Sequence, residues 1–113
     1  MSEPTTTPRL SRLATARVLD LEVPVALGFR ARLLGLAGLD RAEAGPGLLI
    51  PRCSSIHTFG MRFALDVFFL DEVDAIVAVR RGICARRVVS CRAASAALEV
   101  PSSQGEEFLA ARP

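Results

Sequence analysis

The sequence predicts one small domain that is mainly β, a β-rich α+β fold, with one short helix. Three observations favour this class. Residues 17–23 alternate between polar and apolar side chains, as a half-buried strand does. Residues 63–70 and 75–79 are nearly continuous apolar runs joined by a short acidic loop, which is typical of a β-hairpin. Convincing helical spacing of apolar side chains occurs only in residues 25–38.

Length and composition limit the chain to one globular unit. Its 113 residues are enough for one core but not for two. Half of the residues are hydrophobic and 23% are charged, which is the composition of a folded chain. No apolar run approaches the roughly 20 residues that span a bilayer. The first twelve residues contain no apolar signal region. We therefore expect a soluble, cytoplasmic protein without a membrane partner.

The charge balance argues against a nucleic-acid partner. The formal net charge is only +2, although all fourteen cations are arginines. Residues 80–92 contain two arginine pairs, Arg80-Arg81 and Arg86-Arg87, which resemble a basic patch. A solvated rim around strand ends is the favoured interpretation, because nucleic-acid binders add stacking aromatic side chains and a clearer charge excess.

The cysteines predict neither a disulfide framework nor a metal site. Cys53, Cys84 and Cys91 are odd in number, and no two of them form a C-x-x-C pair. In a cytoplasmic chain such cysteines are typically small buried hydrophobic residues. We expect no metal and no cofactor.

The N-terminal part of the chain predicts a tail, a strand and a helix. Residues 1–12 are polar and contain two prolines and a threonine run, so we expect a flexible tail that leaves 13–113 as a single β-rich domain. The alternation at 17–23 predicts one antiparallel strand that ends at Pro24. Phe29, Leu33 and Leu36 follow at i, i+4 and i+7, and Gly38 is a plausible helix stop.

The rest of the chain predicts strands and turns. Residues 39–47 form a loop rich in turn formers, followed by a short strand at 47–50 and an extended segment at 53–58. Gly60 marks a bend between two strands. After the hairpin of 63–70 and 75–79, residues 80–92 are ambiguous, and 97–100 predict a strand that stops at Pro101. The remaining residues, 102–113, are mainly polar.

The polar chemistry is concentrated between residues 53 and 71. In an extended segment Ser55 and His57 share a face about 6.5–7 Å apart at Cα, within reach of a side-chain hydrogen bond. Cys53 and His57 lie about 13 Å apart on the same basis, too far for a thiolate–imidazole pair. Asp66 is an acid inside the longest apolar run, so it must be paired, hydrogen-bonded or protonated.

These residues allow three hypotheses. The first is a non-catalytic domain that binds a small molecule or peptide in a pocket with apolar walls and a few polar groups. The second is a hydrolase that uses a Ser55–His57–Asp66 relay, although no G-x-S-x-G elbow exposes the serine. The third is a protein–protein interaction module that pairs through an edge strand or apolar patch. We favour the first and expect a monomer or a weak dimer.

The candidate ligand-binding residues follow from this preference. A lone histidine and aspartate are more often a structural pair than a catalytic one, so no catalytic residue is assigned. The candidates are Ser55, His57, Thr58, Phe59, Met61, Arg62 and Asp66.

Three segments in order resemble an uncharacterised prokaryotic family, domain of unknown function 192. They are FRARLLGL at 29–36, the central GLLIP at 47–51 with IHTFGMRF and LDVFFLD up to residue 71, and ALEVP at 97–101. The resemblance implies a compact jelly-roll-like β-sandwich or barrel, and no established activity. The chain departs from the family pattern after Pro101, where family members usually carry Ala-Gly, and near Ala85, where a proline is usual.

Overall fold

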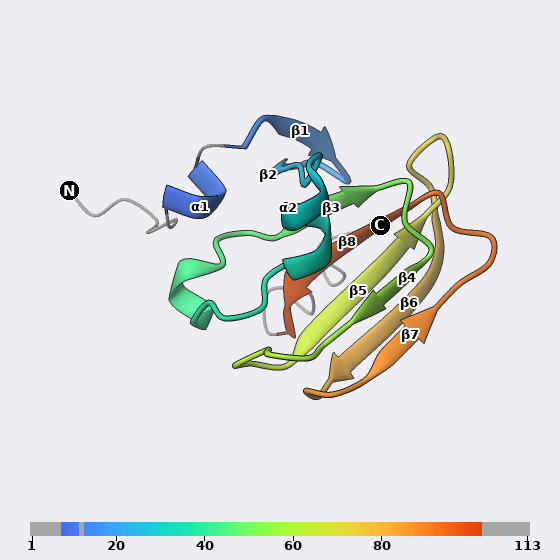
Figure 1. Cartoon of the computed structure of the whole chain (residues 1–113). Coiled ribbons are helices and arrows are strands. Elements are labelled where there is room, and N and C mark those ends of the chain that lie inside the picture. Colours follow the sequence, from blue (N-terminus) through green and yellow to red (C-terminus); the bar gives the residue numbers. More distant parts are fainter. Residues whose placement is uncertain (1–7, 12, 103–113) are drawn as a thin grey trace.

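The computed structural model describes residues 8–11 and 13–102, and in them strands dominate (Figure 1). The strands are β1 (Thr15–Val18), β2 (Leu21–Pro24), β3 (Leu48–Pro51), β4 (Ser55–His57), β5 (Leu65–Leu70), β6 (Ile76–Ile83), β7 (Val88–Ser90) and β8 (Ala96–Pro101). The helical elements are α1 (Pro8–Ser11), α2 (Phe29–Leu34) and the 3-10 turn η1 (Arg41–Glu43). The predicted mainly β class is confirmed, and α2 is the short helix expected within residues 25–38.

A four-stranded antiparallel sheet, in the order β3-β8-β5-β6, is the centre of the molecule. The predicted hairpin is confirmed, because β5 and β6 pair antiparallel across the acidic loop. In that loop the Asp71 carboxylate accepts hydrogen bonds from the backbone N–H groups of Val73 and Ala75 at 2.9 and 3.0 Å. The last described strand, β8, lies inside the sheet between β3 and β5.

Both faces of the central sheet are covered, which explains why β5 and β8 are buried along their whole length. Side chains from alternate positions enter two separate cores. The first core includes Leu65, Val67, Phe69 and Ala97. The second core includes Phe68, Leu70, Leu98 and Val100.

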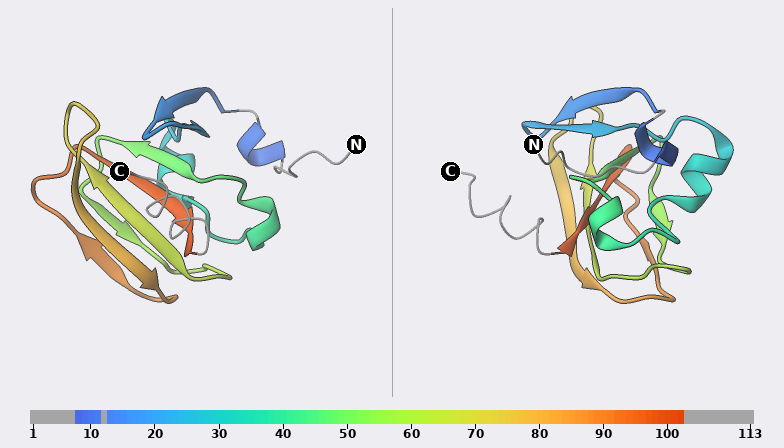
Figure 2. Two further views of the ribbon diagram at one scale, coloured as in Figure 1. Left: turned by 180° about the vertical axis from the view of Figure 1, so that it is seen from behind. Right: turned by 90° about the vertical axis from the view of Figure 1, so that its left-hand side faces the viewer.

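Different elements cover the two faces. The short β4–β7 sheet and the end of the α2 segment cover the first core, to which Ile56 and Leu36 contribute. The β1–β2 hairpin covers the second core through Val18 and Val23. In Figures 1 and 2 this hairpin lies at the top of the molecule and the β6–β7 connection at the bottom. The three sheets stay separate in the described residues, so no closed barrel forms.

The prediction of one strand over residues 17–23 was wrong. The chain reverses at Leu19 and Asp20, whose φ angles are 50° and 65°, and forms the two strands β1 and β2. Two consecutive residues with positive φ are the signature of a type I′ hairpin turn. Such turns usually contain Asn-Gly or Asp-Gly, so the Leu-Asp turn gave no signal in the sequence.

The N-terminal boundary and the helix also differ from expectation. Residues 8–11, which were assigned to the flexible tail, form one helical turn whose Leu10 is only 2% exposed and belongs to the first core. Helix α2 covers only Phe29–Leu34, because Gly35 leaves helical geometry with φ 56° and ψ −127°. Gly60 has φ 81°, as the predicted bend requires. The expected tail residues 1–7 and the polar end 103–113 lie outside the described residues.

Candidate functional site

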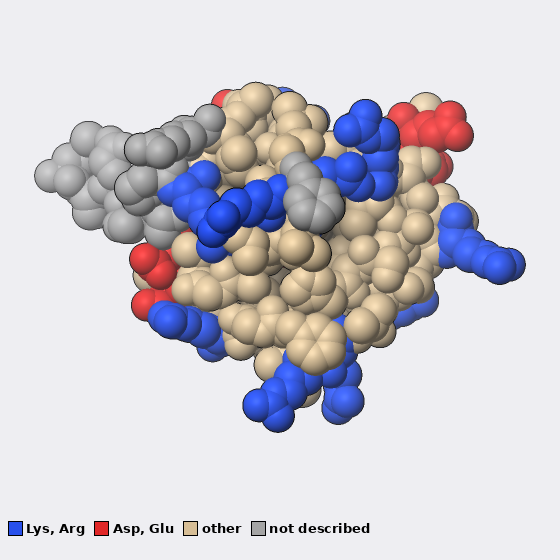
Figure 3. All heavy atoms as spheres, viewed as in Figure 1, with Lys and Arg blue, Asp and Glu red and all other residues tan. Residues whose placement is uncertain are grey.

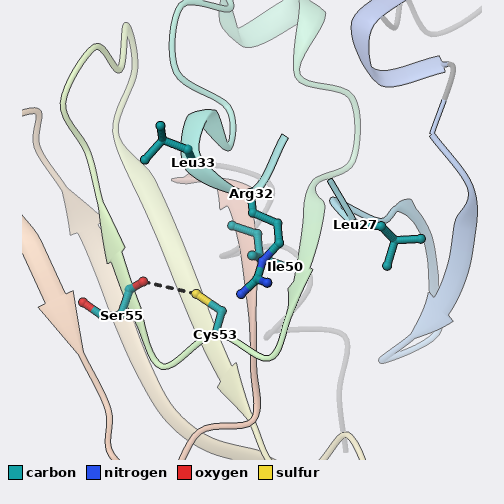
Figure 4. A pocket seen from close by; sticks show the side chains of 6 residues that line it. All are labelled: Leu27, Arg32, Leu33, Ile50, Cys53 and Ser55. Atoms are coloured by element: carbon teal, nitrogen blue, oxygen red, sulfur yellow. Dashed lines mark hydrogen bonds between the residues drawn. The ribbon is translucent and has the colours of Figure 1, made fainter. Parts of the chain in front are cut away.

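A cavity lies beside helix α2, where it faces strand β3 and the β3–β4 connection (Figure 4). Its outer part has a volume of about 430 Å³. The outer part is lined by Leu27, Arg32, Leu33, Ile50, Cys53 and Ser55. A smaller inner part of about 130 Å³ shares five of these residues and adds Leu34, Ile56, His57 and Glu99. We call the two parts together the α2–β4 cavity.

The inner end of the α2–β4 cavity contains a buried acid, Glu99, from the central strand β8. Glu99 lies directly across from Leu48 on β3 and from Val67 on β5, so its side chain projects from the first-core face. It is 2% exposed, and its Oε1 accepts a 3.2 Å hydrogen bond from the Leu36 backbone N–H. Burial raises the pKa of Glu99 to about 7, and the Leu36 hydrogen bond only partly opposes this.

A guanidinium from α2 lies in the wall of the same cavity. Arg32 donates a 2.8 Å hydrogen bond from Nη2 to the Arg52 carbonyl, which anchors the side chain across the β3–β4 connection. Its Nε is buried and has no hydrogen-bond partner. An unpaired buried donor is unfavourable, so a ligand acceptor at this nitrogen would be stabilising.

Cys53 and Ser55 form the β4 side of the cavity. The Cys53 thiol donates a 3.1 Å hydrogen bond to the Ser55 carbonyl, as drawn in Figure 4. Burial raises the pKa of Cys53, the Ser55 hydrogen bond lowers it, the Glu99 charge raises it and Arg32 lowers it. The Ser55 hydroxyl accepts a 2.9 Å hydrogen bond from Ser90 on the neighbouring strand. The thiol is therefore a neutral wall group at neutral pH.

His57 connects strand β4 to helix α2. Its Nδ1 accepts a 3.1 Å hydrogen bond from the Phe59 backbone N–H, so the proton of the neutral ring sits on Nε2. Nε2 then donates to the Leu33 carbonyl at 2.8 Å. Both ring nitrogens are used by the backbone, and the ring fixes α2 next to β4. The Ser55 hydroxyl bonds to Ser90 and the His57 ring to backbone groups, so these hydrogen bonds do not join the two side chains to each other.

Asp66 lies on the other side of the central sheet. It faces Val100 across the β5–β8 ladder, on the second-core face, whereas Glu99 projects from the first. Asp66 is fully buried, and its Oδ1 accepts hydrogen bonds from the Gly82 N–H at 2.7 Å and the Ser102 hydroxyl at 3.0 Å. The Arg81 Nε lies 3.9 Å from Oδ2. Asp66 therefore does not share a pocket with Ser55 and His57, which line the α2–β4 cavity on the first-core face.

The four other candidate residues have different surroundings. Thr58 is buried and connects to the β6–β7 region, donating to the Cys84 carbonyl at 2.7 Å and accepting from the Arg87 N–H at 2.8 Å. Met61 is 9% exposed and packs in the first core. Arg62 forms an exposed 3.1 Å ion pair with Asp40.

Phe59 is an exposed aromatic residue at the edge of this region. It is 52% exposed, and its ring centroid lies 5.9 Å from that of His57. Of the seven candidates, Ser55 and His57 line the α2–β4 cavity. Five do not: Thr58, Phe59, Met61, Arg62 and Asp66.

The cavity also contains residues that were not candidates, above all Glu99 and Arg32. One signal for Glu99 was present in the sequence. The acid interrupts the apolar segment of residues 96–101, just as Asp66 interrupts residues 63–70. Arg32 gave no such signal, because an arginine off the apolar stripe of a helix is expected to face solvent.

Two features are absent from the described part of the chain. Residues 8–11 and 13–102 contain no group of three or more His, Cys, Asp or Glu side chains arranged to hold a metal ion. None of the helices in those same ranges has the length and apolar character needed to cross a membrane.

Comparison with known proteins gives the family of the chain. The family model described as "Uncharacterized ACR" (DUF192) matches residues 12–109, so the chain belongs to this family and the resemblance inferred from its motifs is confirmed. No curated protein matches the chain.

Two solved structures share the fold. A protein from Sinorhizobium meliloti 1021, described as "a putative transcription regulator", has a TM-score of 0.70 at 18% identity. The match covers 82% of this chain and 77% of that protein. A protein of unknown function from Novosphingobium aromaticivorans DSM 12444 has a TM-score of 0.62 at 14% identity, over 96% of this chain and 94% of that one. At these identities the likeness concerns the fold alone.

Proposed function

We propose that this domain binds a small ligand without catalysis, and that the binding site is the α2–β4 cavity. The observation that carries the proposal is that one cavity contains both the buried acid Glu99 and Arg32, whose Nε has no hydrogen-bond partner. A few polar groups among apolar walls are the usual composition of a ligand site, and about 430 Å³ is within the usual size range.

Two buried side-chain polar atoms in the described residues lack a hydrogen-bond partner, Arg32 Nε in the cavity wall and Asp66 Oδ2 on the other face of the sheet. Asp66 Oδ2 has the Arg81 guanidinium at 3.9 Å, whereas Arg32 Nε lies beside an open volume. Thr58, which is also buried, has protein partners at hydrogen-bond distance. A fold that needed Glu99 and Arg32 only for stability would be better served by apolar side chains, because burying an unpaired charged or polar group is unfavourable. Retention of both groups beside an open volume is what a binding site requires.

The hydrolase interpretation takes second place for geometric reasons. Its serine and histidine both line the cavity, but the Ser55 hydroxyl bonds to Ser90 and both His57 nitrogens bond to backbone groups. A general base must reach the proton that it abstracts. Asp66, the third member, projects from the opposite face of the sheet. We accordingly propose a binding role for Ser55 and His57 as wall residues.

A fragment screen followed by two-dimensional NMR tests the proposal. Binders should shift the backbone amide signals of Arg32, Cys53 and Ser55. Ser55→Phe places a bulky ring in the cavity wall and should abolish these shifts. Ser54→Phe is the matched control, since the exposed Ser54 precedes β4 and does not line the cavity. Binders whose shifts persist in Ser55→Phe and map elsewhere would contradict the proposed site.

The state of assembly is part of the same proposal. We propose that the domain acts as a monomer or weak dimer, because each copy contains a complete cavity lined by its own residues. Sedimentation velocity over a range of concentrations should give a species of 12.1 kDa that associates weakly or not at all. A tight dimer at the lowest concentration would favour the interaction-module alternative instead.

A further inference from the structure

The charge of the cavity lining selects among ligand classes. Four ionisable side chains line the α2–β4 cavity: Arg32, Cys53, His57 and Glu99. Arg32 is always charged. His57 Nδ1 accepts a backbone hydrogen bond and Nε2 donates one to a carbonyl, and burial raises the pKa of the Cys53 thiol. Below neutral pH Glu99 is uncharged, which leaves one unopposed positive charge in the wall.

The surrounding surface has the same sign. On the face of the molecule seen in Figure 3, arginine side chains are spread over the region of α2 and the strands beside it, and acidic side chains lie toward the margins. Charges of one sign around a concave site raise the local concentration of ligands of the opposite sign. The surface therefore favours an anion.

The other walls of the cavity are apolar and favour a ligand that has an apolar body. Leu27 and Leu33 at the outer part are 56% and 55% exposed, so two large aliphatic side chains beside the same cavity are open to water. Ile50, which is buried, forms the wall between them and the inner part. A ligand with an aliphatic or aromatic body would remove both leucines from water.

Glu99 selects a particular kind of anion. Its Oε1 already accepts the Leu36 N–H, and a protonated carboxyl offers one O–H donor. A carboxylate can accept that O–H with one oxygen and the Arg32 Nε–H with the other. A carboxylic acid kept neutral by its apolar surroundings so that it can donate a hydrogen bond is an established use of such a site.

We infer that the α2–β4 cavity binds monocarboxylates with a compact apolar body, which Arg32 and protonated Glu99 hold through the two carboxylate oxygens. This inference rests on the proposed binding function. It requires that affinity fall as the pH rises above neutral, because ionised Glu99 would repel the anion that its protonated form binds. His57 and Cys53 also line the cavity, so the Glu99→Gln variant is needed to separate the contribution of Glu99 from theirs.

Three probes of the same size test the ligand class: hexanoate, hexanamide and hexylammonium. Isothermal titration at about pH 6 should show binding of hexanoate at least about tenfold tighter than of either of the others, the ratio that one hydrogen bond to a charged group supplies. Raising the pH to about 8.5 should weaken hexanoate binding by about tenfold or more. Equal or tighter binding of hexylammonium would overturn the inference.

Two variants test the assigned roles. Arg32→Gln should weaken hexanoate binding by at least about tenfold at both pH values. Glu99→Gln keeps a donor in place and should make hexanoate affinity independent of pH. Arg30→Gln is the matched control, since Arg30 is an exposed arginine of the same helix that does not line the cavity. The inference would be overturned if Arg30→Gln lost as much hexanoate affinity as Arg32→Gln. It would also be overturned if the affinity of Glu99→Gln for hexanoate still depended on pH.

The outcomes for the two proposals are separable. If hexanamide or hexylammonium binds more tightly than hexanoate and shifts the amide signals of the cavity residues, the carboxylate inference is refuted. The binding function then remains supported. Failure of hexanoate in a protein whose cavity accepts other fragments would do the same. Failure of both the probes and the fragment screen would refute both.

Discussion

Two buried acids lie on neighbouring strands of the central sheet, and the fold treats them in opposite ways. Asp66 on β5 projects from the second-core face and receives two hydrogen bonds, from Gly82 and Ser102. Glu99 on β8 projects from the first-core face, receives one backbone hydrogen bond and faces a cavity. Both are essentially without solvent exposure.

The difference teaches that burial alone does not identify a functional acid. The partners of Asp66 come from the strand end of β8 and from the irregular pairing of β5 with β6, so this carboxylate connects parts of the fold. Glu99 has an apolar environment and room beside it, and burial raises its pKa to about 7. We assign a structural role to the first and a binding role to the second.

The largest expected effect is the change of the free energy of unfolding with pH that Glu99 produces. Its pKa of about 7 in the folded protein exceeds the ordinary value of 4.5, so the folded chain holds a proton that the unfolded chain has lost. The free energy of unfolding should therefore fall by about 3 kcal/mol as the pH rises through that window, and level off above it. Urea unfolding at a series of pH values measures the fall.

Glu99→Gln provides the control for that measurement. The amide oxygen can still accept the Leu36 N–H, and the variant has no proton to release. Its stability should lack this fall and exceed that of the unchanged protein above neutral pH. The assignment would be contradicted if the decline between the two pH limits were the same in both proteins.

The next effect concerns the structural acid. Asp66→Ala removes the acceptor of two hydrogen bonds from a fully buried position, and should lower the free energy of unfolding by about 2–3 kcal/mol. Urea unfolding at a fixed pH measures this. Ser102→Ala removes only one of the two donors and should lower stability by about 1 kcal/mol. An Asp66→Ala protein as stable as its parent would remove the distinction between the two acids.

A smaller effect is expected where the backbone passes close to Glu99. At Gly35, with φ 56°, an added Cβ would lie 2.6 Å from Glu99 Oε1. Gly35→Ala should therefore lower the free energy of unfolding by about 2 kcal/mol. In a Glu99→Ala background the loss should be smaller, because the contact is gone and only the backbone strain remains.

Gly28 is the matched control for Gly35. An added Cβ there would have no atom within 4 Å, and φ is −77°, a conformation that any residue adopts. Gly28→Ala should change stability by less than about 0.5 kcal/mol. Thermal unfolding of the parent, Gly35→Ala, Glu99→Ala, the Gly35→Ala/Glu99→Ala double variant and Gly28→Ala measures these differences. A loss at Gly28 as large as at Gly35 would refute the steric explanation.

The smallest effect separates exposed from buried charge. Arg62 and Asp40 form an ion pair whose side chains are 61% and 65% exposed. Arg62→Ala should lower the free energy of unfolding by less than about 0.5 kcal/mol, since exposed pairs are screened by water and salt. A loss comparable to that of Asp66→Ala would show that burial does not set the ranking.

Much of the fold could be predicted from the sequence, because local patterns encode it. The β5–β6 hairpin follows from two apolar runs around an acidic turn. The β1–β2 hairpin could not be found in this way. Alternation continues through Leu19 and Asp20, and only their positive φ angles reverse the chain. Those angles are selected by tertiary packing of Val18 and Val23 and not by glycine or asparagine.

The candidate site was less predictable, because it depends on which faces of distant strands meet. Ser55 and His57 line the cavity, as their shared face on an extended segment allows. Asp66 and Glu99 could not be assigned to faces without the register of β5 against β8, which pairs Asp66 with Val100 and Val67 with Glu99. A shift of one residue in this pairing would place the two acids on the same face of the sheet.

The position of β8 has a consequence for how the chain folds. This strand comes last among the described strands, yet it lies between β3 and β5, so the central sheet cannot be completed before residues 96–101 are available. Its pairing with β3 joins Leu48 to Glu99, a contact between distant parts of the chain. Non-local pairing slows folding because the loop must close first. The inner end of the α2–β4 cavity contains Glu99 from β8. The cavity is therefore completed only when β8 pairs with β3 and β5.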